Sequence, residues 1–353
     1  MENEIKVGFE TASLDDSEPP GSLVAKSNLN IIKEKQKLSL TEPVNLGSFF
    51  ISRKQKFEIV SDIEECRKLW QELAKPKTLF DTWEFRYAFY LGYGFKPYFL
   101  VLRSLTKNLA FLPLWYDEDE KKYVWFGSSW QEEVRFFAKN PRHLSDLIAA
   151  APSPLFLNAL SLEAARSLDQ SLDLIPDDAK YILKLKDFKS QEDYLASLKK
   201  NDRRNLKKDR RKIQDQNPQI IINNFADFDQ LVALSKKRLA QKGDKADWED
   251  PRRIETFRQV IKLSGHSYQA RMISIKIDDR IAGVDLICLF KNTYFAIKCG
   301  YNVVEFSGIG NYMNLLEIDD AIKLKMEKID FLQNNYTWKS KLFESIPLFK
   351  YEK

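Results

Sequence analysis

The chain has 353 residues, of which 44% are hydrophobic and 30% charged, and its formal net charge is +5. This composition excludes a disordered or fibrous chain and leaves room for two hydrophobic cores. There is no apolar run long enough to cross a membrane, and the N-terminus lacks the basic and apolar segments of a signal peptide. We therefore expect a soluble, cytoplasmic protein with no membrane span.

The few cysteines and histidines limit the chemistry further. Cys66, Cys288 and Cys299 do not have the spacing of metal ligands, and the last two lie in apolar runs typical of strands. We expect them to be small core residues in a reducing compartment. The chain has two histidines, so neither a His-based zinc site nor a Ser-His triad is expected, and we predict no metal.

The first elements follow a polar segment. Residues 1–48 are acid-rich and short of aromatic side chains, which predicts a disordered tail. From Phe49 onward the composition is typical of a folded domain. Residues 57–60 have a strand pattern, and residues 63–73 have the period of an amphipathic helix that Asp62 can cap.

Residues 80–99 contain ten aromatic side chains, more than one face of a helix can bury. Two interpretations stay open: an aromatic core packed on a sheet, or a helix that forms one wall of a cleft. Three strands follow at 96–103, 108–116 and 123–127, separated by short polar turns, and they predict an antiparallel meander.

The rest of the first half completes one domain. A helix is predicted at 131–139, a strand at 154–160, a helix at 162–172 and a strand at 181–185. We place the end of this N-terminal domain at residue 188, so that it covers residues 49–188.

The second half opens with a strongly basic segment, residues 191–213, whose sparse apolar stripe predicts one surface helix. Nine of the fourteen residues from Lys199 to Lys212 are basic. The basic run is either a solvated helix face or a surface for an anionic ligand, for which Arg203 and Arg204 are the candidate substrate-binding residues. It has no interleaved aromatic residues, so sequence-specific nucleic-acid binding is not expected.

Two helices, at 227–240 and 251–263, lead to a second meander within residues 269–302. A turn, Ser307-Gly308-Ile309-Gly310-Asn311, then opens a helix that precedes a short strand at 328–332. The repeated meander predicts two similar domains, each a central mixed sheet flanked by helices, with the second covering residues 189–353.

The turn at 307–311 is a candidate anion site. Glycine permits positive φ and a close approach of the backbone, and the first N–H groups of a helix have no partner within it. A pyrophosphate is a common ligand of such a turn, although the same pattern also serves ordinary chain reversal.

Four segments together resemble the FemAB/CelD-like acyltransferases, a family of tandem GNAT-fold (general N-acetyltransferase) proteins. They are, in order, Phe80-Asp81-Thr82-Trp83, Phe111-Leu112-Pro113-Leu114, the run Tyr194-Leu195-Ala196-Ser197-Leu198 with Arg203-Arg204-Asn205-Leu206, and Asp330-Phe331 with Trp338-Lys339. The chain departs from the family pattern where Asn334 replaces a glycine, Trp338 a tyrosine, and Glu305 the Gln or Arg that opens the pyrophosphate turn.

The resemblance implies a transferase that moves an acyl group onto an amine or hydroxyl of a small, anionic acceptor, often in cell-envelope or polysaccharide synthesis. It implies acyl-CoA or acetyl-CoA as co-substrate, held by residues 307–311, and an oxyanion site at the amides of residues 298–300. For proton removal we predict Asp330 and Tyr336, and for a phosphate on the substrate Lys339. Each of these three residues also has a purely structural interpretation.

Two alternatives stay open. The basic helix and Glu305 favour an aminoacyl-tRNA-dependent transferase of the same family. Asn334 and the missing Gln or Arg favour a binding protein that kept the fold without catalysis.

Overall fold

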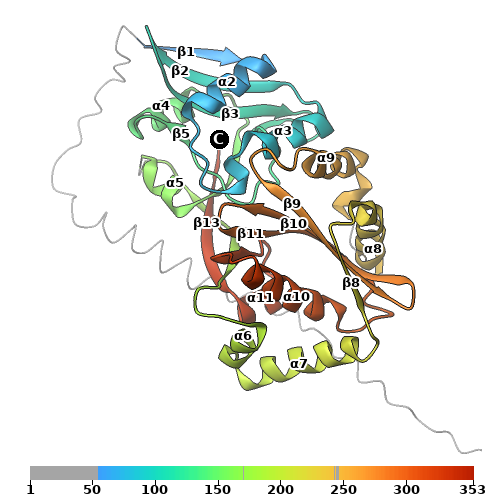
Figure 1. The fold of residues 1–353 in the computed structure, drawn as a ribbon. Helices are drawn as coiled ribbons and strands as arrows, with labels where there is room; N and C mark the ends of the chain where they lie inside the picture. Colours follow the sequence, from blue (N-terminus) through green and yellow to red (C-terminus); the bar gives the residue numbers. More distant parts are fainter. Residues whose placement is uncertain (1–54, 170, 242, 244–245) are drawn as a thin grey trace, which may run out of the picture. The chain divides into compact units, whose positions relative to one another are not determined.

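The computed structural model describes residues 55–169, 171–241, 243 and 246–353, which belong to one of the two units of the chain, Pro43–Lys353 (Figure 1). The predicted tail at residues 1–48 lies outside the described residues. No described helix is both long and apolar enough to cross a bilayer.

The first half contains an antiparallel sheet with the order β1-β2-β3-β4, and a short β5 pairs with β3. Its strands are β1 (Gln55–Val60), β2 (Pro97–Ser104), β3 (Asn108–Asp117), β4 (Lys122–Trp125) and β5 (Phe137–Ala138). The helices of this half are α2 (Ile63–Leu73), α3 (Trp83–Tyr93), α4 (Arg142–Ala150) and α5 (Leu162–Ser167). The predicted first meander is therefore present as β2, β3 and β4.

The second sheet has eight strands in the order β6-β13-β7-β12-β11-β10-β9-β8. Its strands are β6 (Phe156–Leu160), β7 (Ile175–Lys184), β8 (Gln219–Ile222), β9 (Gln269–Ile277), β10 (Arg280–Phe290), β11 (Thr293–Tyr301), β12 (Lys328–Asp330) and β13 (Glu344–Glu352). β9, β10 and β11 form the predicted second meander. Because β6 and β7 lie before residue 188 but pair in this sheet, strand pairing joins the two halves, and a domain division at residue 188 stays a prediction.

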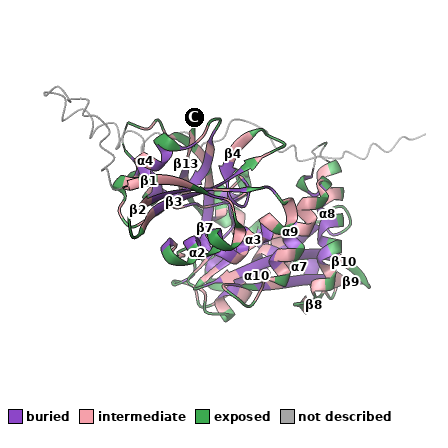
Figure 2. Ribbon diagram, turned by 90° about the horizontal axis from the view of Figure 1, so that it is seen from above, coloured by how far each residue is buried: buried purple, intermediate pink, exposed green. Residues whose placement is uncertain are grey.

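Helices cover both faces of the meander in the second sheet. They are α6 (Gln191–Ser197), α7 (Lys200–Gln214), α8 (Phe228–Gln241), α9 (Pro251–Lys262), α10 (Ile309–Lys323) and α11 (Thr337–Leu342). Side chains of α6, α7 and α10 share one core with the strands, whereas α8 and α9 share the other core with α3. Figure 2 shows that buried residues follow the strands and the inner sides of these helices.

Six of the ten aromatic side chains at 80–99 are buried, which favours the first of the two interpretations, an aromatic core. Phe80, Phe85 and Phe89 are fully buried and contact rings of both halves, including Phe257 of α9 and Phe295 of β11. These contacts tie α3 to the second half of the chain.

Two local predictions are wrong. The segment 131–139 is not a helix: Val134 bridges to Leu160 and residues 137–138 form β5, so contacts with distant strands override its helical pattern. The predicted single helix at 191–213 is two helices, because Leu198 and Lys199 adopt extended backbone between α6 and α7.

Candidate active site

Two strands of the second sheet separate after a short common stretch. β11 and β12 run parallel and pair only from Thr293 to Phe295 on β11 and from Lys328 to Asp330 on β12. Within the β10–β11 ladder, Leu286 pairs with Lys298 but Ile287 pairs with Ala296, so the register shifts by one residue of β11. Such a bulge bends a strand and increases its twist. Beyond the end of β12, residues 296–298 of β11 therefore have no strand partner on the β12 side among the described residues.

Asp330, a predicted catalytic residue, lies at the end of β12 but is fully engaged. Its Oδ2 is 2.8 Å from Nζ of Lys180, and its Oδ1 accepts a 3.0 Å hydrogen bond from the amide of Leu332. Lys180 also contacts Glu133 at 2.5 Å. Burial lowers the pKa of the Lys180 ammonium, but the two carboxylates outweigh this and raise it overall. Asp330 is therefore the partner of a buried lysine, and its role as a base stays a prediction.

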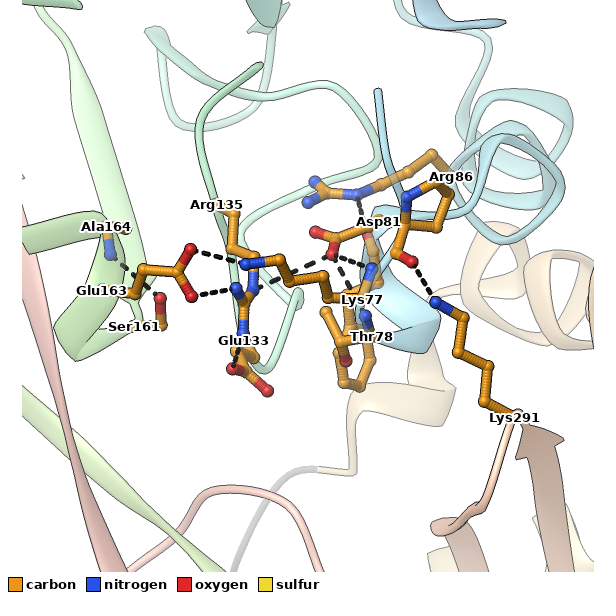
Figure 3. A network of polar contacts seen from close by, with 12 residues as sticks. Lys77, Thr78, Asp81, Arg86, Glu133, Arg135, Ser161, Glu163, Ala164 and Lys291 are labelled. Carbon is orange, nitrogen blue, oxygen red and sulfur yellow. Dashed lines mark hydrogen bonds and ion pairs between the residues drawn. The ribbon is translucent and has the colours of Figure 1, made fainter. Parts of the chain in front are cut away.

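A network of polar contacts extends from Glu133 to Arg135, Asp81 and Glu163 (Figure 3). Arg135 lies 3.6 Å from Glu133, reaches Asp81 at 4.0 Å and pairs with Glu163. The Asp81 carboxylate in turn accepts the backbone N–H of Lys77 at 2.9 Å. This network fixes the segment around residues 132–135 against β7.

Glu132 is the functional candidate that the sequence analysis missed. Its side chain is 5% exposed and accepts a 2.7 Å hydrogen bond from the amide of Gln333. Burial raises the pKa of this carboxyl to about 7, while the nearby positive charges of Lys339 and Lys298 oppose the rise. The residue lies in the segment 131–139, which was predicted as a helix, and no motif in that segment points to a catalytic role.

Lys339, a predicted phosphate ligand, is buried and donates to two backbone carbonyls. Its Nζ lies 2.7 Å from the oxygen of Phe331 and 2.6 Å from that of Gln333. Burial lowers the pKa of its ammonium. Lys339 therefore holds the loop that presents the Gln333 amide to Glu132.

Tyr336, the other predicted catalytic residue, is 52% exposed just before α11. Its ring lies 5.5 Å from the Lys339 ammonium. The structure thus brings Asp330, Lys339 and Glu132 together, and places Tyr336 at the edge of this cluster without a contact to a carboxylate among the described residues.

Lys298, beside the bulge, is surrounded by aromatic rings. Its Nζ is 4.9 Å from the ring centre of Trp130 and 5.0 Å from that of Trp248, and it pairs with Asp247 at 2.5 Å. Burial lowers its pKa. Farther along β11, a Cβ on Gly300 would collide with the carbonyl oxygen of Leu231, because α8 crosses the strand there. The predicted oxyanion segment 298–300 is therefore closed off by α8 at Gly300, and the part of β11 without a β12 partner is residues 296–298.

Backbone conformation and packing within the protein explain the two glycines of the turn at 307–311. Gly308 has φ of 92°, and a Cβ there would lie 3.0 Å from Cγ of Asp209 on α7. The Asp209 carboxylate accepts a 2.6 Å hydrogen bond from Nδ2 of Asn311. A Cβ on Gly310 would lie 3.4 Å from the ring of Tyr301.

These contacts decide how well a pyrophosphate fits the turn. A carboxylate already lies against Gly308, and Glu305, three residues earlier, adds a second acid that pairs with Arg280. The Asp209 carboxylate opposes a bound pyrophosphate, whereas the charge of Glu305 is compensated by Arg280. Ser307 is exposed, whereas the side chain of Ile309 is core. With α7 in its observed place, the residues at 305–311 do not fit the pyrophosphate of acyl-CoA.

The two candidate arginines of α7 lie away from this cluster. Arg203 donates to the carbonyl of Ala196 at 3.0 Å, and Arg204 is exposed. α7 packs on α6 and α10, and no hydrogen bond or ion pair among the described residues links it to Lys339. The predicted anionic acceptor stays a prediction.

Comparison with known proteins gives one family and several related folds. Residues 200–340 match the model of the family described as the acetyltransferase (GNAT) domain. The match includes β11, the turn at 307–311, α10 and β12. Comparison of the sequence with curated proteins gives no match.

Several solved structures share the fold across most of the chain. FemX is 8% identical, with a TM-score of 0.52 over 84% of this chain and 97% of that one. L-PGS from Bacillus licheniformis is 9% identical, with a TM-score of 0.53 over 83% and 92%. A conserved protein of unknown function from Bacteroides thetaiotaomicron is 11% identical, with a TM-score of 0.52 over 84% and 100%.

The predicted mixed α/β fold is thereby confirmed by the fold shared with FemX, and the predicted enzyme class by the match to the GNAT domain. The chain is an acyltransferase with a GNAT-type acetyltransferase domain at residues 200–340, as its resemblance to the FemAB/CelD-like acyltransferases predicted.

Proposed function

We propose that the protein transfers an acyl group onto an amine beyond the end of β12, beside residues 296–298 of β11, with Glu132 as the general base. The observation that carries this proposal is a buried carboxyl with a pKa of about 7, held beside the bulged strand by the Gln333 amide. A base works best when its pKa lies near the working pH. At a pH near 7 the charged and neutral forms of the Glu132 carboxyl have similar free energies, as proton transfer requires.

Acyl transfer to an amine requires removal of a proton, stabilisation of an oxyanion and departure of the leaving group. The amine nitrogen attacks the carbonyl carbon of the acyl donor, and its proton passes to the Glu132 carboxylate. The developing oxyanion needs N–H donors, for which the backbone at 296–298 is the candidate. The leaving group departs as the carbonyl re-forms. Lys339 and Lys298 keep the Glu132 anion accessible by opposing the effect of burial.

Glu132→Gln tests the base. We expect kcat to fall by about 10²–10⁴-fold while the fold is retained, because the amide keeps the acceptor for the Gln333 N–H. The parent rate should rise with pH up to about 7 and then level off, and this rise should disappear in the variant. The assay follows acylated product by mass spectrometry with a panel of primary amines.

Asp330→Asn is the matched control for Glu132→Gln. We expect it to lower stability, because it leaves the buried Lys180 with one counter-charge fewer. If Asp330→Asn removes the acid limb of the rate profile and Glu132→Gln does not, the base is Asp330 and our assignment fails.

For the donor, we propose an aminoacyl ester carried by tRNA, since such a donor needs no pyrophosphate in the turn at 307–311. The carboxylate of Asp209 supports this choice. A second candidate is acyl-CoA, supported by the family match, because GNAT domains generally use acyl-CoA and the match covers the turn.

A substitution of Asp209 distinguishes the two candidate donors. Substituting either glycine would disturb packing whatever the ligand, so the cleaner change is Asp209→Ala, with Asn311 left in place. We expect the parent to bind CoA weakly in calorimetric titration and the variant to bind it at least about tenfold more tightly, because one like charge is removed. Tight binding by the parent, unchanged in Asp209→Ala, would instead establish the acyl-CoA candidate.

A further inference from the structure

The helix α7 divides its charges between two faces. Its two acids, Asp202 and Asp209, are half-buried on the side that carries the buried Leu206 and Ile213. The exposed side carries Lys200, Arg204, Lys207, Lys208 and Arg211. Residues three or four apart lie on one side of a helix, so these five form a continuous basic row. The acids within α7 therefore do not neutralise the row that faces the solvent.

Few acidic side chains outside α7 neutralise this basic row either. Lys207 pairs with Glu192 at 2.9 Å, and Arg211 lies 3.8 Å from the exposed Asp215. Lys200, Arg204 and Lys208 have no ion-pair partner among the residues that the structure describes. We call Lys200, Arg204, Lys208 and Arg211 the basic stripe. It extends over 12 residues, about 16 Å along the helix.

Exposed isoleucines lie next to the basic stripe along the chain. Residues 215–218 connect α7 to β8, the edge strand of the second sheet (Figure 1). Ile220 and Ile222 of this strand are 47% and 41% exposed. Their register partners, Ile275 and Ile273, belong to the core shared with α7 and α10. Paired residues project from the same face of a sheet, so both exposed isoleucines lie on the α7 side.

We propose that the basic stripe, together with Ile220 and Ile222, docks on the surface of an anionic lipid bilayer. The argument is charge complementarity combined with exposed apolar side chains on β8, the strand that follows α7. A bilayer with anionic headgroups attracts a row of basic side chains and accepts apolar ones at its interface. The apolar face of α7 itself is used against α10, so the helix would lie on the headgroups and the isoleucines would enter the interface.

RNA, including the tRNA that we propose as acyl donor, is the competing partner of the basic stripe, and the residues of this surface favour it less. RNA-binding surfaces without sequence preference combine a basic groove with aromatic platforms on which bases stack. α7 and β8 carry no aromatic side chain. The docking surface is independent of the acyl-transfer site, because the basic stripe faces away from α10 and none of its residues contacts Glu132 or Lys339 among the described residues.

The test is co-sedimentation of the full chain with vesicles. We expect binding to vesicles of phosphatidylcholine and phosphatidylglycerol, no binding to pure phosphatidylcholine, and loss of binding as salt is raised. Arg204→Glu with Lys208→Glu should weaken binding by at least about twentyfold, since each basic side chain near an anionic surface contributes about fivefold. Ile220→Ser with Ile222→Ser should weaken it severalfold and leave the salt dependence unchanged.

Two matched controls keep the test specific. Lys237→Glu with Lys262→Glu changes the net charge equally at exposed sites on α8 and α9, and Leu105→Ser removes an apolar side chain that is 80% exposed in the first half. Both should bind like the parent. Absence of binding by the parent, or equal losses in the two charge-reversal variants, would overturn the proposal. So would a loss of affinity in Arg204→Glu with Lys208→Glu for an RNA oligonucleotide but not for the anionic vesicles, which would identify RNA as the partner.

Discussion

Two acids are buried between the second sheet and α10. Asp285 of β10 is 1% exposed and Glu317 of α10 is 2% exposed. Burial raises the pKa of Asp285 to about 7, and Tyr301 and Arg238 offset this only in part. Burial, and then the charge of Asp285, raise the pKa of Glu317 well above its usual value. Near neutral pH both carboxyls therefore retain protons that they would lose in the unfolded chain.

This arrangement makes stability depend on pH. Between about pH 4 and pH 7 the folded state binds a proton at Asp285 that the unfolded state releases, so the free energy of unfolding falls as the pH rises. In Asp285→Asn this fall should be smaller, by about 1.4 kcal/mol for each unit of pKa shift removed. Urea unfolding at pH 5 and pH 8.5 measures it. Asp278→Asn, on the exposed hairpin, is the control, and an equal slope in parent and Asp285→Asn would contradict the prediction.

At the scale of single residues, the sequence pointed to two members of the cluster around Glu132, the base that we propose. Asp330 and Lys339 were predicted near the chemistry and do lie beside Glu132. Their roles could not be derived, because the sequence does not show that Lys180 would reach Asp330 across the sheet. Glu132 was missed for the same reason: its raised pKa comes from burial between segments some 200 residues apart.

Elements with a strong local pattern were predicted well, and those that depend on distant contacts were not. The helix at 63–73 and the strands of both meanders follow from periodicity, because one face of each is buried. The segment 131–139 has a helical pattern but forms ion pairs and bridges with β6 and β7. The family resemblance gave the fold class, whereas periodicity could not show that β7 would insert between β12 and β13.

The contact between α3 and α9 depends on one glycine. A Cβ on Gly92 would collide with Oγ1 of Thr256 and lie 2.8 Å from the carbonyl oxygen of Arg252. Gly92→Ala should therefore lower the free energy of unfolding by about 1–3 kcal/mol, because overpacking forces the helices apart. Chemical denaturation measures the loss. Leu91→Ala, at a neighbouring exposed position, should cost far less, and adding Thr256→Ala should restore part of the loss; a fully stable Gly92→Ala would disprove the tight packing.

At the scale of the whole molecule, the eight-stranded sheet decides where the chain can be divided. β7 belongs to the first half by sequence but lies between β12 and β13. It pairs with β12 from Lys184 to Ile182 and with β13 over most of its length. A strand with two partners satisfies the backbone groups of both neighbours, so its removal exposes two unpaired edges inside the sheet.

We therefore expect the second half to fold only when β7 is included. A fragment of residues 189–353 should lack cooperative unfolding, whereas a fragment of residues 174–353, which adds β7 and leaves only the edge strand β6 behind, should recover it in part. Circular dichroism during urea unfolding compares the two, and amide exchange at β12 shows whether that strand is paired. Adding a synthetic peptide of residues 174–186 to the shorter fragment is the control, because it restores the strand without the covalent link. If the fragment 189–353 unfolds as cooperatively as the longer one, the predicted division at residue 188 stands and β7 is dispensable for the sheet.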